Sequence, residues 1–126
     1  MSAAQINKAD ILPLAYQVIE SLNVENFRCF KKLQLKGLKR INVIVGENAS
    51  GKTALLESLF ATIGTSAEIV FRLKRFRGYF ETFKIQADRR AYESLWRDFF
   101  FDFDESNAIS IMLQGSHRHT RSLKIT

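Results

Sequence analysis

Eight consecutive residues, 46–53, carry the types and the spacing of a phosphate-binding loop. Gly46, Gly51, Lys52 and Thr53 occupy the fixed positions of the pattern G-x-x-x-x-G-K-[ST]. Glycine can take backbone angles closed to other residues, so successive N–H groups can turn inward as a nest for phosphate oxygens. We expect Lys52 to reach the β- and γ-phosphates of a nucleotide and the Thr53 hydroxyl to bind the bridging Mg²⁺. The remaining loop residues, also expected at the nucleotide, are Glu47, Asn48, Ala49 and Ser50.

The segments on either side of the loop have the order that such a loop requires. Residues 41–45 read Ile-Asn-Val-Ile-Val, a β-branched run that predicts a strand. Residues 54–60 are apolar at helical spacing and predict a helix, whose positive dipole end would face the phosphates. Strand, glycine loop and helix together favour a genuine nucleotide site over a chance match.

Two further pairs of strands flank this unit. Residues 18–38 alternate apolar and polar types over two runs, which is typical of half-buried antiparallel strands. Residues 108–113 and 122–126 are strand-like runs on either side of a connection that contains Gly115. We expect the second pair to form a hairpin beside the first.

Three stretches, 22–30, 33–35 and 41–59, resemble the N-terminus of the ABC-type, AAA-family ATPase heads of RecF, OLD nucleases and SMC proteins. In those proteins a strand of the form x-N-F-R/K-x-F precedes I-N-x-I-x-G-x-N-x-x-G-K-S/T-x-L-L-E-A-L. The resemblance covers roughly a third of the chain. It implies that the ligands are ATP and Mg²⁺, that two heads dimerise face to face around two nucleotides, and that the protein acts on DNA.

The resemblance also implies roles for two single residues. Asn48 would face the γ-phosphate side of the loop, and Arg28 would lie near the nucleotide from the end of the first strand. An exposed turn cation is an equal alternative for Arg28. Phe27 and Phe30, on either side of it, are expected in the core rather than stacked on a base.

Residues 65–81 combine an apolar stripe at helical spacing with four cations. The cations are Arg72, Lys74, Arg75 and Arg77. A phosphate-tracking patch for nucleic acid is one interpretation. We favour a solvated helix face over an apolar stripe, because four cations on one amphipathic helix are common.

Residues 89–101 predict a helix with an aromatic face, and the acidic residues after it invite a comparison with Walker B. That motif is an apolar strand that ends in Asp-Glu, as Asp104 and Glu105 follow a run of phenylalanines here. Because the aromatic run continues a helical period, we interpret residues 104–107 as a turn.

Other candidates receive no chemical role. Residues 7–10 match the guanine-recognition pattern N-K-x-D, but they precede the loop that they would normally follow. His117 and His119 lack a third metal ligand nearby. The single Cys29 excludes an internal disulfide, and we expect it to be a small buried hydrophobe.

The composition bounds the partners and the compartment. A chain of 126 residues with 46% hydrophobic and 25% charged residues forms at most one globular domain. Its formal charge of +6 allows an anionic partner such as DNA without requiring one. With no signal-type start, no apolar run of membrane length and one cysteine, we expect a cytoplasmic protein.

These observations predict an α/β fold: a P-loop NTPase core, part of an ABC-type ATPase head, with added antiparallel strands. Residues 1–17 would be an N-terminal arm, and 18–126 the N-terminal lobe of a head without its Walker B, signature motif and switch histidine. We expect ATP binding without efficient hydrolysis, and self-association or assembly with the missing remainder, because apolar faces would stay uncovered. The alternatives are a non-hydrolysing, nucleotide-dependent DNA-binding or assembly module, and a small P-loop kinase or GTPase.

Overall fold

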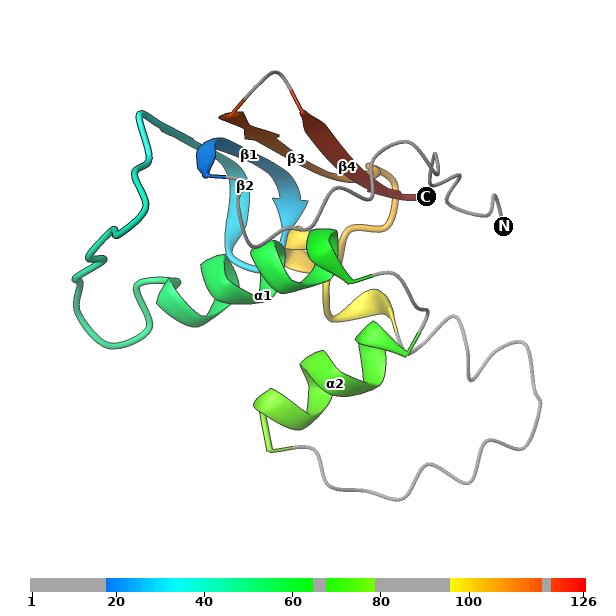
Figure 1. The fold of residues 1–126 in the computed structure, drawn as a ribbon. Coiled ribbons are helices and arrows are strands. Elements are labelled where there is room, and N and C mark those ends of the chain that lie inside the picture. The colour runs from blue at the N-terminus through cyan, green and yellow to red at the C-terminus, as the bar shows by residue number, and fades with distance from the viewer. Residues whose placement is uncertain (1–17, 65–67, 79–95, 117–118) are drawn as a thin grey trace.

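The computed structural model describes residues 18–64, 68–78, 96–116 and 119–126. In these ranges an antiparallel sheet carries helix α1 across one face, and helix α2 packs beside α1 (Figure 1). The elements are β1 (Ile19–Phe27), β2 (Phe30–Lys36), α1 (Lys52–Ile63), α2 (Ile69–Phe76), the 3₁₀ turn η3 (Phe101–Phe103), β3 (Ile109–Gly115) and β4 (Thr120–Ile125). The proposed arm, 1–17, lies outside the described residues.

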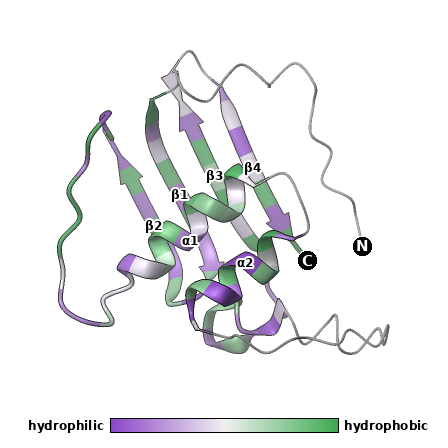
Figure 2. Cartoon of the chain, turned by 60° about the horizontal axis from the view of Figure 1, so that its bottom comes forward, coloured by the Kyte–Doolittle hydropathy of each residue, from purple (hydrophilic) through white to green (hydrophobic). Residues whose placement is uncertain are grey.

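The sheet has the strand order β2-β1-β3-β4, and all its neighbours are antiparallel. Its register aligns apolar residues in rows: Leu22 of β1 lies opposite Leu35 of β2 and Leu113 of β3. Figure 2 shows the resulting alternation of hydrophobic and hydrophilic residues along the strands. Because side chains alternate between faces, this register gathers one apolar face under the helices. Both pairs of strands expected from 18–38 and 108–126 are confirmed.

Helix α1 begins directly after the glycine loop and covers this apolar face. Leu55 and Ala61 are buried within the core cluster. The hydroxyls of Ser58 and Thr62, also buried, donate to the carbonyl oxygens of Leu55 and Ser58 at 2.7 and 2.8 Å. Such bonds within a helix allow polar side chains to be buried without unpaired groups.

The strand predicted over residues 41–45 does not form. The segment between β2 and α1 runs outside the sheet (Figure 1), with Ile41, Val43 and Val45 about 85% exposed. A β-branched run favours an extended strand only where neighbouring strands supply hydrogen bonds and cover its faces. The sheet of the described residues gives this segment neither, so the predicted strand of the P-loop core is absent from this part of the chain.

The segment 96–107 packs aromatic side chains into the core near the end of β1. Phe99 and Phe100 are buried, Phe100 pairs with Phe27 at the end of β1, and the rings of Phe27 and Phe99 lie 6.1 Å apart. The helix predicted over 89–101 falls partly outside the described residues, and its last turn is wrong, because Phe100 is extended and η3 follows it. Core burial of the aromatic rings outweighs helical periodicity here.

Candidate nucleotide site

The end of the glycine loop requires glycine at position 51 for two reasons, its backbone conformation and its close packing. Gly51 has φ +93°, a conformation that favours glycine. A Cβ at this position would also lie 2.9 Å from the Sγ of Cys29 and 3.0 Å from the ring of Phe30. The loop therefore rests directly against the turn between β1 and β2.

Lys52 folds back across the loop and joins its two ends. Its Nζ donates to the carbonyl oxygens of Gly46 and Glu47 at 2.7 and 2.6 Å, and to the Ser50 hydroxyl at 3.3 Å. A Cβ on Gly46 would lie 2.6 Å from the Oγ of Ser50, so a larger residue here would have to displace the Ser50 side chain. The loop thus holds one ammonium group over a tight, solvent-exposed backbone curve.

The start of α1 adds donors to the same curve. The first hydrogen bond of the helix runs from the N–H of Leu55 to the carbonyl of Gly51 at 2.9 Å, so the amides of 52–54 precede the intrahelical ladder. Thr53, in the first turn, is exposed, and its hydroxyl can bind a cation held by phosphates. Amide donors, a helix N-terminus, an ammonium and a hydroxyl fit a nucleotide phosphate with Mg²⁺.

Arg28 lies beside this loop but is held by acidic groups. Its side chain is 9% exposed, and its Nε donates to Glu57 Oε2 at 3.0 Å. Its Nη1 donates to the carbonyl oxygen of Asp98 at 2.8 Å and to its carboxylate at 3.2 Å, and its guanidinium lies 4.0 Å from the centre of the Phe99 ring. The exposed turn cation is therefore wrong, while contact with nucleotide stays a prediction.

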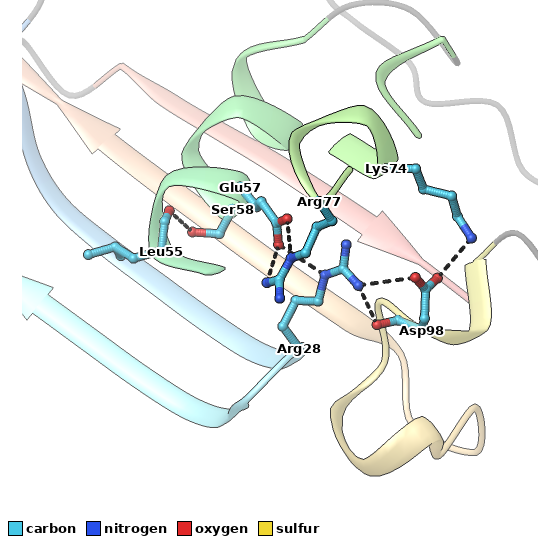
Figure 3. A network of polar contacts seen from close by, with 7 residues as sticks. All are labelled: Arg28, Leu55, Glu57, Ser58, Lys74, Arg77 and Asp98. Atoms are coloured by element: carbon cyan, nitrogen blue, oxygen red, sulfur yellow. Dashed lines mark hydrogen bonds and ion pairs between the residues drawn. The ribbon is translucent and has the colours of Figure 1, made fainter. Parts of the chain in front are cut away.

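Glu57 is a buried carboxylate shared by two arginines, as Figure 3 shows. It is 1% exposed and pairs with Arg28 from the turn and with Arg77 from the end of α2. Arg77 makes two bonds to it, at 2.8 and 3.0 Å, and the hydrogen bond raises the pKa of Arg77 above its usual value. Glu57 received no role from the sequence alone. The available signals were a charged residue on a helical face expected to be buried and the glutamate at this position of the family pattern.

The basic run of α2 divides into two groups. Lys74 is 12% exposed and its Nζ lies 3.2 Å from the Asp98 carboxylate, while Arg77 pairs with Glu57. Arg72 and Arg75 are exposed. The favoured solvated face therefore holds for Arg72, Arg75 and the partly exposed Arg77, and only Lys74 is largely covered.

Comparison with known proteins agrees with this geometry. The family described as the AAA ATPase domain matches residues 18–120. The chain belongs to this family. No solved structure matches it.

Relatives of this AAA ATPase domain share shorter stretches. The chain is 39% identical over 49 residues to an ATP/GTP phosphatase of Helicobacter pylori, which is 39% of this chain and 13% of that protein. It is 42% identical over 50 residues to structural maintenance of chromosomes protein 6 of Dictyostelium discoideum, 40% of this chain and 4% of that protein. It is 48% identical over 42 residues to the DNA replication and repair protein RecF of Idiomarina loihiensis, 33% of this chain and 12% of that protein.

The resemblance to an N-terminal segment of an ABC-type ATPase is thereby confirmed, and with it a P-loop nucleotide-binding family. The matched stretches span between 4% and 13% of the length of these relatives. Neither described helix of the domain is long and apolar enough to span a membrane.

Asp104 and Glu105 are not arranged as a Walker B pair of this ATPase family. They precede β3 instead of ending a strand. Asp104 accepts hydrogen bonds from the amide and the hydroxyl of Ser106 and from the Asn107 amide group, and those of Ser106, the largest influence, lower its pKa. The interpretation of 104–107 as a turn is confirmed.

The remaining candidates, Cys29, residues 7–10 and the histidines, gain no chemical role from the structure. Cys29 is exposed, so its predicted burial is wrong; it lies in the tight turn between β1 and β2, where Gly51 fills the space next to it. Residues 7–10 and His117 lie outside the described ranges. Among the residues that the structure does describe, no cluster of three metal-binding side chains occurs.

Proposed function

We propose that this chain binds ATP with Mg²⁺ at residues 46–53, as the N-terminal part of an ABC-type ATPase head. The observation that carries the proposal is the Lys52 ammonium held across the loop by the carbonyls of Gly46 and Glu47. Phosphate oxygens can take the place of those carbonyls, because they offer the same cation stronger, charged acceptors. Thr53 would be the protein ligand of Mg²⁺, and Asn48 would face the γ-phosphate.

Hydrolysis requires more than this site. A carboxylate must hold the metal or orient the attacking water. Asp104 and Glu105, the pair considered for this role, lie in a turn before β3 and make local contacts. We infer that the carboxylate comes from elsewhere in the protein or from a second chain, so that the described residues bind ATP without efficient turnover.

The segment before the loop exposes apolar side chains that assembly could cover. The exposed side chains of Ile41, Val43 and Val45 are of the type that lines buried parallel strands. We propose that neighbouring strands cover them when the head is complete, in a head-to-head homodimer or through the remainder of the head. Relatives named for DNA replication and repair and for chromosome maintenance support a role in DNA transactions. We propose the cytoplasm as the compartment, on the sequence features given above.

Titration with a fluorescent ATP analogue, with and without Mg²⁺ and with released phosphate followed in the same samples, tests the proposal. Lys52→Ala should weaken binding by at least about tenfold, since a charged hydrogen bond is lost. Lys36→Ala, which removes an exposed lysine of β2, is the matched control and should bind as the wild type does. Phosphate release by the wild-type protein would contradict the inferred absence of turnover. No binding of the analogue by folded wild-type protein would overturn the proposal.

A further inference from the structure

Five charged side chains form one network beside the nucleotide site, the Glu57 cluster: Arg28, Glu57, Lys74, Arg77 and Asp98 (Figure 3). They come from four parts of the fold: the β1–β2 turn, α1, the end of α2 and the segment before η3. The cluster therefore connects α2 to the elements that hold the loop.

The charges of the Glu57 cluster do not balance. Three cations face two carboxylates, and both arginines share the one carboxylate of Glu57. Nη2 of Arg28 is buried and has no hydrogen-bond partner. Arg28 and Glu57 are buried, while the Arg77 side chain is 37% exposed and makes two of the hydrogen bonds that fix the Glu57 carboxylate.

Two short connections lead from this cluster to the loop. Glu57 lies about one and a half turns after Lys52 on the same rigid helix. Arg28 is followed at once by Cys29, whose Sγ lies within 2.9 Å of the place that a Cβ on Gly51 would take. A shift of Arg28 would therefore move Cys29, which packs against Gly51 at the end of the loop.

We propose that Arg77 is a positioning residue for the nucleotide site, which acts through Glu57 on Arg28 and makes nucleotide affinity depend on the docking of α2. This inference rests on the proposed function and adds a form of regulation to it. Without Arg77, the Glu57 carboxylate loses two of the hydrogen bonds that fix its position, so Arg28 and the turn at Cys29 are held less firmly against Gly51. Any partner that displaces α2 then weakens nucleotide binding.

The test compares Arg77→Gln with Arg75→Gln, which removes an exposed arginine of the same helix. Arg77→Gln should weaken binding of the ATP analogue about fivefold, within the range of known couplings between sites. Arg75→Gln should leave it unchanged. The alkylation rate of Cys29, the chain's single cysteine, should rise in nucleotide-free Arg77→Gln and not in Arg75→Gln.

A merely structural role would not give the same pattern. In an Arg28→Gln background, Arg77→Gln should have no further effect on affinity, and Arg77→Lys, which keeps the charge, should recover part of it. If Arg77→Gln does not fold, the affinity and the Cys29 alkylation rate of Arg77→Lys are compared with those of Arg75→Gln instead. Equal affinity and equal Cys29 alkylation in the folded Arg77 variants and the wild type would overturn the inference alone. No binding by the wild type would overturn it together with the proposed function.

Discussion

The sheet under α1 and residues 41–45 are both rich in β-branched residues but differ in environment. Leu22 in β1 is fully buried between two antiparallel neighbours, whereas Val43 is 84% exposed. The sheet is built from two hairpins, β1–β2 and β3–β4, joined by the long-range pairing of β1 with β3, and α1 covers one of its faces. The segment before the loop needs strands on both sides, so residue type alone does not bury it.

The largest expected effect separates these two regions directly. Leu22→Ala should destabilise the domain by about 2–5 kcal/mol, because it leaves a cavity between β1, its neighbours and α1. Val43→Ala should change the free energy of unfolding by less than about 0.5 kcal/mol. Urea unfolding followed by circular dichroism measures both. A large loss in Val43→Ala would mean that this segment is buried in solution.

Glycine substitutions test the contact between the loop and the β1–β2 turn through their effect on the free energy of unfolding. Gly51→Ala should cost about 1–3 kcal/mol, because alanine must adopt φ +93° and also displace Cys29 and Phe30. Gly37→Ala, at φ +70° with open space around it, should cost only about 1 kcal/mol.

Thermal unfolding measures this difference, and binding of the ATP analogue should weaken in Gly51→Ala alone. Equal stability losses for the two variants would contradict the close packing between the loop and the β1–β2 turn.

The smallest expected effect concerns a turn that is exposed and yet fixed. Hydrogen bonds from Ser106 lower the pKa of Asp104, so the unfolded chain binds this proton more tightly than the folded one. The resulting stabilisation is present above the ordinary aspartate pKa and is lost as the pH falls through the lower, folded-state pKa.

An NMR titration of Asp104 checks this shift, and Ser106→Ala should return the pKa toward its ordinary range. An unshifted pKa of Asp104 in the wild type would contradict the hydrogen bonds from Ser106 that fix this turn.

Local patterns predicted much of this molecule. Alternation in 18–38 and the spacing after Lys52 indicated β1, β2 and α1, and the glycine loop pattern indicated the nucleotide site. The Glu57 cluster could not be predicted, because Arg28, Glu57 and Asp98 meet only after the chain has folded. The strand at 41–45 failed for the complementary reason: its apolar residues are of the correct type, but strand formation depends on neighbours that sequence patterns do not supply.

The contact of Lys52 with the carbonyls of Gly46 and Glu47 has one more consequence. If the loop binds phosphate as proposed, these oxygens compete with the ligand, and an incoming phosphate exchanges with them rather than simply adding to the loop. The gain on binding is thus a difference between two sets of acceptors. We expect a ligand with a single phosphate to leave the internal contacts largely intact, and a triphosphate to replace them, so the loop would discriminate by the length of the phosphate chain.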